Sequence, residues 1–267
     1  MGHAAGHVAR RRFGQHFLVD ASVIDAIVAA IDPREGQVIV EIGPGLAALT
    51  AALLGRVRHL HAVEIDRDLA ARLQRRWGPD RLGLHQADAL RFDFSRIAPG
   101  DGAAPPLRLV GNLPYNISSP LLVHLLAFRS RIADQHFMLQ KEVVERIVAG
   151  PGGSGFGRLS VLLQAYYDVE ALFAVPPQAF EPPPAVESAV LRMTVRRAAA
   201  DDETAPLQRL LAAGFAQRRK MIRKTLLPWL AARGVDAHGL DPALRPEDLG
   251  VATWLDLARR LREAEGR

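Results

Sequence analysis

Apolar and polar positions follow two different periods along the first half of the chain. Residues 21–31 place apolar side chains at the spacing of an amphipathic helix, and residues 38–42 form a short apolar run typical of a buried strand. The alternation continues through five more predicted elements, helices at 46–54 and 69–77 and strands at 59–65, 82–86 and 107–110. Strands that alternate with helices predict an α/β domain with a doubly wound, mostly parallel sheet.

The second half of the chain predicts further strands and then helices alone. Six elements are expected up to residue 195, strands at 135–139, 167–175 and 186–195 and helices at 121–128, 141–148 and 159–166. Beyond an alanine-rich polar linker at 196–205, the pattern is helical at 207–217, 221–232 and 254–261. We therefore expect three parts: a basic N-terminal segment at 1–20, an α/β domain at 21–197 and a small all-α domain at 198–267.

Composition excludes several kinds of chemistry. The 267 residues are 49% hydrophobic, which is enough to fill the cores of one large and one small domain. The absence of cysteine excludes disulfides, thiolate metal sites and a cysteine nucleophile. No apolar stretch has the length of a signal peptide core or a membrane span, so a cytoplasmic location without membrane contact is expected.

The charge balance fits a polyanionic partner without requiring one. The chain has 34 basic and 29 acidic residues, a net charge of +5. Arginine is strongly preferred over lysine, and genomic bias explains this preference as well as phosphate recognition does. The most compact basic cluster consists of Arg218, Arg219 and Lys220, followed by Arg223 and Lys224. This cluster is a candidate contact for RNA phosphates, and a solvated helix face is the alternative.

Acidic residues lie at or just beyond the ends of three successive predicted strands. They are Glu41, Glu64, Asp66 and Asp88. The carboxyl ends of parallel strands meet at one edge of a sheet, and this edge is where ligands of such folds bind. Gly43 and Gly45, just after the first strand, allow the backbone to approach a ligand closely.

Charge decides between two cofactors for this edge. Gly43, Gly45 and Ala48 satisfy a loose dinucleotide pattern, but the pyrophosphate of NAD would face four carboxylates. S-adenosylmethionine carries a sulfonium and an ammonium group, which acidic residues attract. In this interpretation Glu64 binds the ribose diol of the cofactor, the Asp88 side chain binds the amino group of the cofactor's adenine, and Glu41 helps to hold the cofactor's methionine part. Solvated acids at strand ends are the alternative.

The segment Gly111-Asn112-Leu113-Pro114-Tyr115-Asn116 follows the fourth predicted strand and suggests the reaction. The exocyclic amino group of adenine is a poor nucleophile because its lone pair is delocalised into the ring. The Asn112 side-chain oxygen and the Leu113 carbonyl can each accept one amino hydrogen, which localises that lone pair. Pro114 holds Leu113 extended, and Tyr115 offers a ring for base stacking. An Asn-x-Pro turn beside a core tyrosine is the alternative.

Two other segments contain aromatic residues that are candidates for substrate contact. Phe180 lies in the stiff, proline-rich connection 176–184 and is a candidate second face for clamping a base opposite Tyr115. A phenylalanine that packs this connection onto the core is an equal alternative. The arginine run 10–12 leads into the segment 13–18, which either grips nucleic acid or anchors a basic tail.

Seven segments occur in the order of one known family. They are Phe13-Gly14-Gln15-His16-Phe17-Leu18, Glu41-Ile42-Gly43-Pro44-Gly45-Leu46, Val63-Glu64-Ile65-Asp66, Ala87-Asp88-Ala89, Asn112-Leu113-Pro114-Tyr115-Asn116-Ile117-Ser118, Leu139-Gln140-Lys141-Glu142-Val143 and the stretch 180–188. Together they resemble the ribosomal RNA adenine dimethyltransferases, most closely the bacterial small-subunit enzymes, over residues 8–261.

This resemblance implies a class I S-adenosylmethionine-dependent methyltransferase, with a Rossmann-like cofactor-binding domain at 21–197 and a helical RNA-binding domain at 198–267. It implies dimethylation of two adjacent adenosines near the 3′ end of small-subunit (16S) rRNA, a monomer, and the small subunit or its immature form as partner. The cofactor-site residues that it implies are His16, Leu18, Gly43, Glu64, Asp88 and Asn112. Two positions depart from the pattern: Ala47 replaces a third glycine, and Ala185 replaces a lysine that offers an RNA contact.

Three other functions stay open at this point. A related enzyme type methylates large-subunit RNA and confers macrolide resistance. A ribosome assembly factor or a transcription factor could keep this fold with catalysis as a secondary role. A DNA adenine methyltransferase is the third. The intact segment around Asn112 favours an enzyme.

Overall fold

The computed structural model describes residues 3–4, 7–8, 16–97, 106–196 and 203–266. The arginine run 10–12, residues 13–15 of the first motif and linker residues 197–202 lie outside the described residues. The chain forms two compact units, Met1–Val144 with Glu170–Val195, and Glu145–Val169 with Arg196–Arg267. Each unit is described by itself below.

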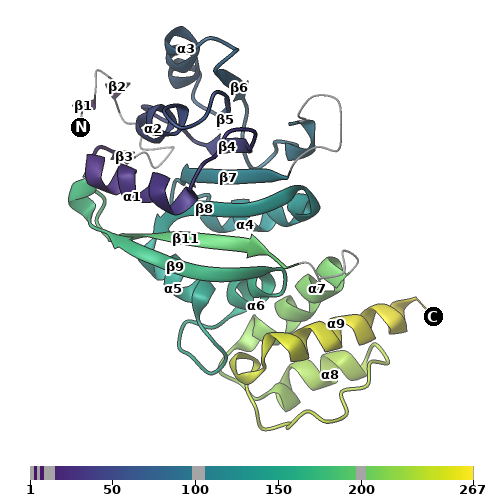
Figure 1. The fold of residues 1–267 in the computed structure, drawn as a ribbon. Coiled ribbons are helices and arrows are strands. Elements are labelled where there is room, and N and C mark those ends of the chain that lie inside the picture. The colour runs from purple at the N-terminus through teal and green to yellow at the C-terminus, as the bar shows by residue number, and fades with distance from the viewer. Residues whose placement is uncertain (1–2, 5–6, 9–15, 98–105, 197–202, 267) are drawn as a thin grey trace. The chain divides into compact units, whose positions relative to one another are not determined.

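A seven-stranded sheet forms the centre of the first unit. In spatial order the strands are β6 (Leu82–Gln86), β5 (Leu60–Glu64), β4 (Val38–Ile42), β7 (Leu107–Asn112), β8 (Ile132–Gln140), β11 (Ser188–Val195) and β9 (Tyr167–Val175). The five strands from β6 to β8 run parallel, and β11 is antiparallel to β8 (Figure 1). This strand arrangement confirms the predicted α/β class and mostly parallel sheet. Such a sheet needs cover on both faces, because its strands are apolar and buried.

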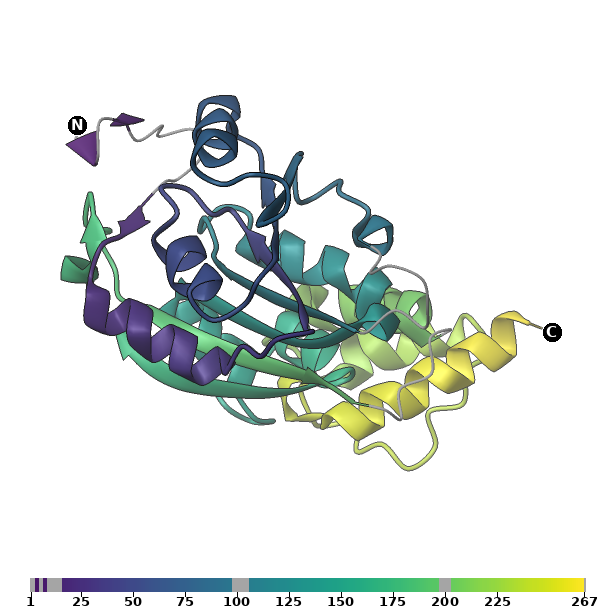
Figure 2. The same ribbon diagram turned by 45° about the horizontal axis from the view of Figure 1, so that its top comes forward.

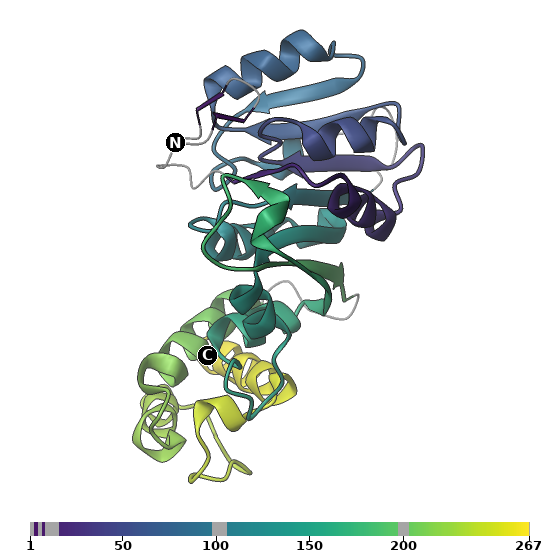
Figure 3. The same ribbon diagram turned by 90° about the vertical axis from the view of Figure 1, so that its left-hand side faces the viewer.

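Helices cover both faces of these strands, as Figures 1 and 3 show, with α1 and α2 on one face and α4 on the other. The helices along this part of the chain are α1 (Ala21–Ile31), α2 (Ala48–Leu54), α3 (Arg67–Arg76) and α4 (Ser118–Leu125), and α5 (Lys141–Val148) follows β8 and continues into the second unit. The buried side chains Val28, Ile31 and Leu53 join Ile39 and Val110 of the sheet in one core. This packing fixes the strand ends relative to the helices that follow them.

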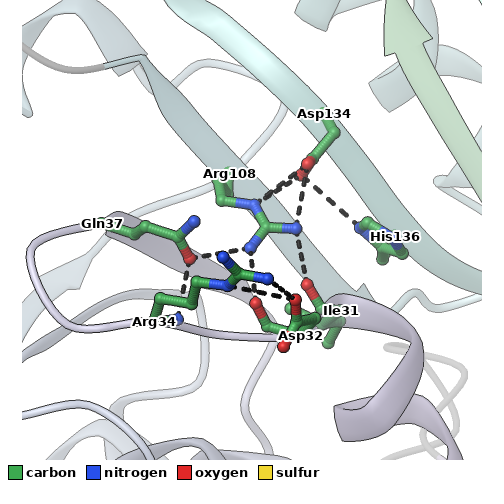
Figure 4. A network of polar contacts seen from close by, with 7 residues as sticks. All are labelled: Ile31, Asp32, Arg34, Gln37, Arg108, Asp134 and His136. Atoms are coloured by element: carbon green, nitrogen blue, oxygen red, sulfur yellow. Dashed lines mark hydrogen bonds and ion pairs between the residues drawn. The ribbon is translucent and has the colours of Figure 1, made fainter.

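Polar side chains cap the start of α1 and tie its end to the sheet, and Figure 4 shows the contacts at its end. At the start of the helix, Asp20 accepts a hydrogen bond from the Ser22 amide at 2.8 Å. At its end, Arg108 of β7 donates to the Ile31 carbonyl at 2.6 Å and pairs with Asp134 of β8 at 2.9 Å. The guanidinium thus satisfies a carbonyl that the helix leaves without a partner.

A short strand near the N-terminus pairs with the proline-rich connection, which the sequence pattern did not predict. Strand β3 (Phe17–Leu18) is antiparallel to β10 (Phe180–Glu181), with Leu18 opposite Phe180. The amide of Val19 also donates to the carbonyl of Ala179 at 2.9 Å. A second two-residue pair, β1 (His3–Ala4) with β2 (His7–Val8), lies further upstream. The β3–β10 pair holds residues 16–18 against the first unit.

The second unit is helical, with α6 (Arg158–Gln164), α7 (Thr204–Gly214), α8 (Leu226–Ala231) and α9 (Val251–Glu265). Helices α7 and α9 pack together (Figure 2) around the fully buried ring of Trp254. A Cβ atom on Gly214 would lie 2.4 Å from that ring, so only glycine permits this approach. No helix in the described part of the chain is long and apolar enough to cross a membrane.

Two expectations about this half of the chain need correction. Residues 145–169, which the sequence placed in the α/β domain, belong to the compact helical unit. The helix predicted at 221–232 is interrupted, because a 3₁₀ turn at Ile222–Lys224 precedes α8. Thr225 between them has φ −132° and ψ −70°, outside the helical region.

Candidate active site

A cavity lies at the carboxyl-terminal edge of the parallel strands in the first unit. The ends of β4, β5, β6 and β7 and the turns after them form most of its wall, and the segment around β3 forms the rest. Every predicted cofactor-site residue lines it: His16, Leu18, Glu41, Gly43, Glu64, Asp88 and Asn112. Leu113 and Tyr115 line it as well, so the structure brings the predicted cofactor residues and the predicted reacting segment into one cavity.

The turn between β4 and α2 needs unusual backbone geometry. Gly43 has φ +67° and Gly45 has φ +56°, values in the left-handed region that glycine adopts readily. A Cβ atom on Gly45 would lie 3.2 Å from the ring of Phe17, whereas one on Gly43 would meet no atom within 4 Å. Gly43 therefore leaves open space beside the backbone on the wall of the cavity.

Ala47, which stands in place of a third glycine, also adopts the left-handed conformation. Its φ is +72°, and it precedes the first residue of α2. A Cβ atom in this region is close to the following carbonyl, which costs about 1–2 kcal/mol. Ala47 does not line the cavity, so this strain lies in the backbone that joins the turn to α2 and not in the cavity wall.

Glu41 and Glu64 place two buried carboxyl groups at the base of the cavity. Glu64 is 4% exposed, and its two oxygens accept hydrogen bonds from the backbone amides of Asp66 at 2.8 Å and Gly45 at 3.2 Å. Glu41 is 2% exposed and accepts a hydrogen bond from the Thr50 hydroxyl at 2.6 Å. Thr50 is a supporting residue that the sequence reasoning missed. Among the described residues, no cation forms an ion pair with either glutamate.

Burial and mutual repulsion shift the ionisation of this pair. Burial raises the pKa of Glu41 to about 7, against the opposing hydrogen bond from Thr50 and with added repulsion from Glu64. Burial also raises the pKa of Glu64, while its backbone hydrogen bonds act in the other direction. A positive charge that enters the cavity therefore stabilises the ionised forms of both carboxyl groups, and these in turn favour the binding of a cationic ligand.

The other two acids at the strand ends have different surroundings. Asp88 lines the cavity and accepts a hydrogen bond from the Leu90 amide at 3.0 Å through one oxygen. Asp66 is 1% exposed, does not line the cavity and caps α3 through the Asp68 amide at 2.9 Å. Asp66 is therefore a capping residue, and three of the four acids form the cavity wall.

Asn112 ends β7 with its side chain anchored at one end. Its Nδ2 donates to the backbone carbonyl of His16 at 2.9 Å. Among the described residues, none donates a hydrogen bond to its Oδ1 or to the carbonyl oxygen of Leu113. The backbone of Leu113 is held by its own amide, which donates to the Met138 carbonyl at 3.1 Å. The Oδ1 of Asn112 and the carbonyl oxygen of Leu113 are therefore held in place and can accept hydrogen bonds from a ligand.

Tyr115 is held at its hydroxyl and along its ring. The hydroxyl is 2.7 Å from the Oγ of Ser188, a fully buried residue that the sequence reasoning did not assign. The ring stacks on the His16 imidazole with centroids 5.7 Å apart and an angle of 28°. His16 is itself held, because its Nδ1 donates to the Pro182 carbonyl at 2.8 Å. No sequence pattern indicated these contacts, because the partners are remote from Tyr115 along the chain.

The expected role of Phe180 needs correction. Phe180 is 3% exposed and packs in the core that contains Leu18 and Ala179. It does not line the cavity, so it presents no face for a base opposite Tyr115. Its pairing with Leu18 in the β10–β3 ladder explains this position, since the ladder turns the side chain into the core. The alternative of a phenylalanine that packs the connection onto the core is the correct one.

The predicted basic cluster lies in the second unit and divides into two kinds of residue. Arg218 pairs with Glu247 and donates to the carbonyl of Ser154, so its guanidinium serves the fold. Arg219 and Lys220 are exposed, as are Arg223 and Lys224 nearby. The four exposed cations are available to an anionic partner.

Comparisons with known proteins identify the family. A sequence profile described as "Ribosomal RNA adenine dimethylase" matches residues 6–263. The chain belongs to this family. The family predicted from the motifs is therefore confirmed, and so is the prediction that the chain is an rRNA adenine dimethyltransferase.

Curated relatives agree with each other in name. "Ribosomal RNA small subunit methyltransferase A" of Thiobacillus denitrificans is 55% identical over 93% of this chain and 96% of the relative. The protein with the same name from Methylibium petroleiphilum is 54% identical over 97% of this chain and 99% of the relative. This family member therefore matches these relatives over nearly their whole length.

Solved structures support the fold. A dimethyladenosine transferase from Plasmodium falciparum superposes with a TM-score of 0.76 at 22% identity, over 94% of this chain and 98% of that chain. The 23S rRNA methyltransferase ErmE superposes with a TM-score of 0.63 at 26% identity, over 92% of this chain and 99% of that chain. The predicted class I methyltransferase fold is confirmed.

Proposed function

We propose that this family member transfers methyl groups from S-adenosylmethionine to the exocyclic amino groups of two adjacent adenosines near the 3′ end of small-subunit rRNA. The observation that carries the proposal is one cavity that joins buried carboxyl groups to the anchored Asn112 amide. The names of relatives at 54–55% identity support the small subunit as substrate. We further propose that the chain acts in the cytoplasm as a monomer.

The donor set of the cavity fits the proposed cofactor. Glu41 and Glu64 favour its positive charges, and Glu64 and Asp88 each lie at a strand end suited to the ribose and the adenine, respectively. Gly43 leaves open the space that a side chain would take. His16 and Leu18 close the cavity from the N-terminal segment. When bound, the cofactor supplies an electrophilic methyl group on a sulfonium.

The chain's own contribution to catalysis is to prepare the nucleophile. In the first transfer, the Oδ1 of Asn112 and the carbonyl of Leu113 accept the two hydrogens of the adenine amino group, which draws the nitrogen toward tetrahedral geometry. In the second transfer, one of these oxygens accepts the single hydrogen that the monomethylated nitrogen retains. The anchoring of Nδ2 on the His16 carbonyl directs Oδ1 away from that contact. Methylation makes the nitrogen acidic, so its proton passes to water and a dedicated base is unnecessary. Tyr115 stacks on the extruded base.

Exposed cations of the second unit supply the contact with the RNA backbone. We assign this role to Arg219 and Lys220, and withdraw Arg218 because Glu247 and the Ser154 carbonyl occupy its guanidinium. Replacing both exposed residues by alanine weakens binding to small subunits and lowers the salt slope by about two, since each cation neutralises about one phosphate. Arg218→Ala is the matched control and changes thermal stability more than the salt slope.

The deciding experiment compares substrates directly. Small subunits that lack the modification, large subunits and DNA are each incubated with the protein and labelled methyl donor, and the methylated nucleosides are mapped. Label in dimethyladenosine of the small-subunit RNA supports the proposal. Label in large-subunit RNA favours the macrolide-resistance type, which the structural likeness to ErmE at 26% identity keeps as the second candidate. Label in DNA alone contradicts both.

A further inference from the structure

Ser188 occupies a position that the sheet topology alone explains. Strand β8 lies between β7 and β11, and β11 runs antiparallel to β8. The first residue of β11 therefore lies beside the last residue of β8, and Ser188 pairs with Gln140. This places a buried hydroxyl at the same edge of the sheet where Asn112 ends β7. Tyr115 reaches across the end of β8 to meet it.

The contact between the two hydroxyls constrains the tyrosine ring. Tyr115 Oη and Ser188 Oγ are 2.7 Å apart, a distance typical of an O–H···O hydrogen bond. Ser188 is fully buried, so water does not compete for its hydroxyl. A hydrogen bond at the tip of the ring fixes the direction of its long axis, since the ring is already attached at Cβ.

His16 constrains the same ring from the side. Its imidazole stacks on Tyr115 at 5.7 Å, and the Nδ1 hydrogen bond to the Pro182 carbonyl holds the imidazole in turn. Because one face of the tyrosine packs on His16, the opposite face is the one left for a base. Phe180 is buried elsewhere and offers no second platform. The target adenine therefore stacks on a single face.

We propose that Ser188 is a positioning residue, whose hydroxyl acts with the His16 imidazole to fix the Tyr115 ring so that it presents one face to the target adenine. This inference rests on the proposed function, because it assumes that an adenine enters the cavity. Ser188 itself touches neither the base nor the cofactor. Its effect passes through the orientation of Tyr115, and so it affects turnover rather than cofactor binding.

Three variants test the inference by kinetics. Ser188→Ala and Tyr115→Phe each remove one partner of the same hydrogen bond, and both variants retain an aromatic ring at residue 115. We expect each to lower kcat on small subunits by about five- to tenfold, as one buried hydrogen bond warrants, with the cofactor Kd from calorimetry unchanged within about twofold. The double variant should be no slower than Tyr115→Phe alone. Effects that multiply, or a wild-type kcat in Tyr115→Phe, overturn the inference.

A spectroscopic measurement tests the hydrogen bond without any activity. The chain has three tyrosines, so the difference between ultraviolet absorbance titrations of a protein with Tyr115 and its Tyr115→Phe counterpart isolates the Tyr115 phenol. Burial raises the pKa of this phenol, and the Ser188 hydrogen bond acts against that rise. Ser188→Ala should therefore raise the pKa further. An unchanged titration midpoint overturns the inference.

The two readouts separate this inference from the proposed function. If the wild-type protein fails to methylate small subunits, the proposed function fails, whatever the titration shows. If methylation is normal but the titration does not respond to Ser188→Ala, only the positioning role fails. Thermal unfolding of each variant shows whether it is folded, and Tyr115→Phe supplies the kinetic test should Ser188→Ala be unstable.

Discussion

The two sides of the cavity are held in place by different kinds of contact. On the acidic side, Glu64 is fixed by the amides of Gly45 and Asp66, nineteen and two residues away, and Glu41 by Thr50, nine residues away. On the reacting side, Asn112 is fixed by a carbonyl 96 residues away and Tyr115 by a hydroxyl 73 residues away. Contacts between residues no more than nineteen positions apart thus hold the charged groups of the site, whereas its reactive geometry depends on contacts between segments much further apart in the chain.

This difference separates binding from turnover. The acids act on the charge of a ligand and need only to be buried near it, a condition that the turns after β4 and β5 and helix α2 provide. The amide and the ring act on the direction of a lone pair and a base, which a small displacement spoils. Variants on the two sides should therefore affect different constants.

The largest expected effect is that of Asn112→Ala on the reacting side. Loss of the acceptor oxygen removes one of two groups that activate the amino nitrogen, so kcat should fall by about 10²–10³, as in the loss of one oxyanion-hole donor. Cofactor affinity should fall by less than about tenfold. Labelled methyl transfer to small subunits and calorimetry measure the two quantities. Turnover near that of the wild type would remove Asn112 from the mechanism.

The next effect is that of Glu64→Gln on the acidic side. Both carboxylate oxygens accept backbone hydrogen bonds, so the amide group of glutamine points a donor at one of two N–H groups. We expect a loss of about 1–3 kcal/mol in the free energy of unfolding and a weaker cofactor Kd, with kcat at saturation less changed. Chemical denaturation and equilibrium binding measure these. A loss confined to kcat would contradict the division between the two sides.

Protonation of Glu41 gives the acidic side a pH dependence. The pKa of this buried carboxyl is about 7 in the folded protein, and a cation binds more tightly once the carboxyl is ionised. Affinity for S-adenosylmethionine should therefore rise with pH up to about 7 and then level off, and Glu41→Gln should flatten this rise. Thr50→Val removes the hydrogen bond that lowers the Glu41 pKa, so it should move the midpoint upward. A pH profile unaffected by either variant counts against the assignment.

The same raised pKa has a consequence for stability, with a definite sign. The unfolded chain ionises this carboxyl near its ordinary value of 4.5, whereas the folded protein retains the proton up to about 7. The unfolded state therefore binds fewer protons between these values, and the Glu41 contribution to stability falls as the pH rises through that window. Urea unfolding of the wild type and Glu41→Gln across this range measures the difference, which vanishes if Glu41 ionises normally.

The smallest effect concerns the support of the turn. Ala47→Gly relieves a left-handed Cβ, and this gain nearly offsets the loss of a buried methyl and the added freedom of the unfolded chain. We expect a change below about 1 kcal/mol in the free energy of unfolding. Ala51→Gly, inside α2, is the matched control and should destabilise by about 0.5–1 kcal/mol. An Ala47→Gly variant clearly less stable than Ala51→Gly would show that φ at residue 47 carries no strain.

Much of the fold and half of the site followed from local sequence. Helix α1 was predicted with its observed bounds because its apolar positions recur at helical spacing, and the structure adds that Asp20 caps its start. The acids and glycines at the strand ends were predicted to converge because parallel strands end at one edge. The sequence alone thus determined the α/β class, the convergence of the acids, the glycines and Asn112 at one edge of the sheet, and the negative charge of the cavity.

Only the tertiary structure decided which remote residues complete the site. The antiparallel direction of β11 places Ser188 beside Tyr115, and the β3–β10 pair places the His16 carbonyl against Asn112 while burying Phe180. Residues 145–169 join the helical unit although their helix and strand were predicted correctly in kind. Hydrophobic periodicity records which face of an element is buried, but it carries no information about which distant segment covers that face.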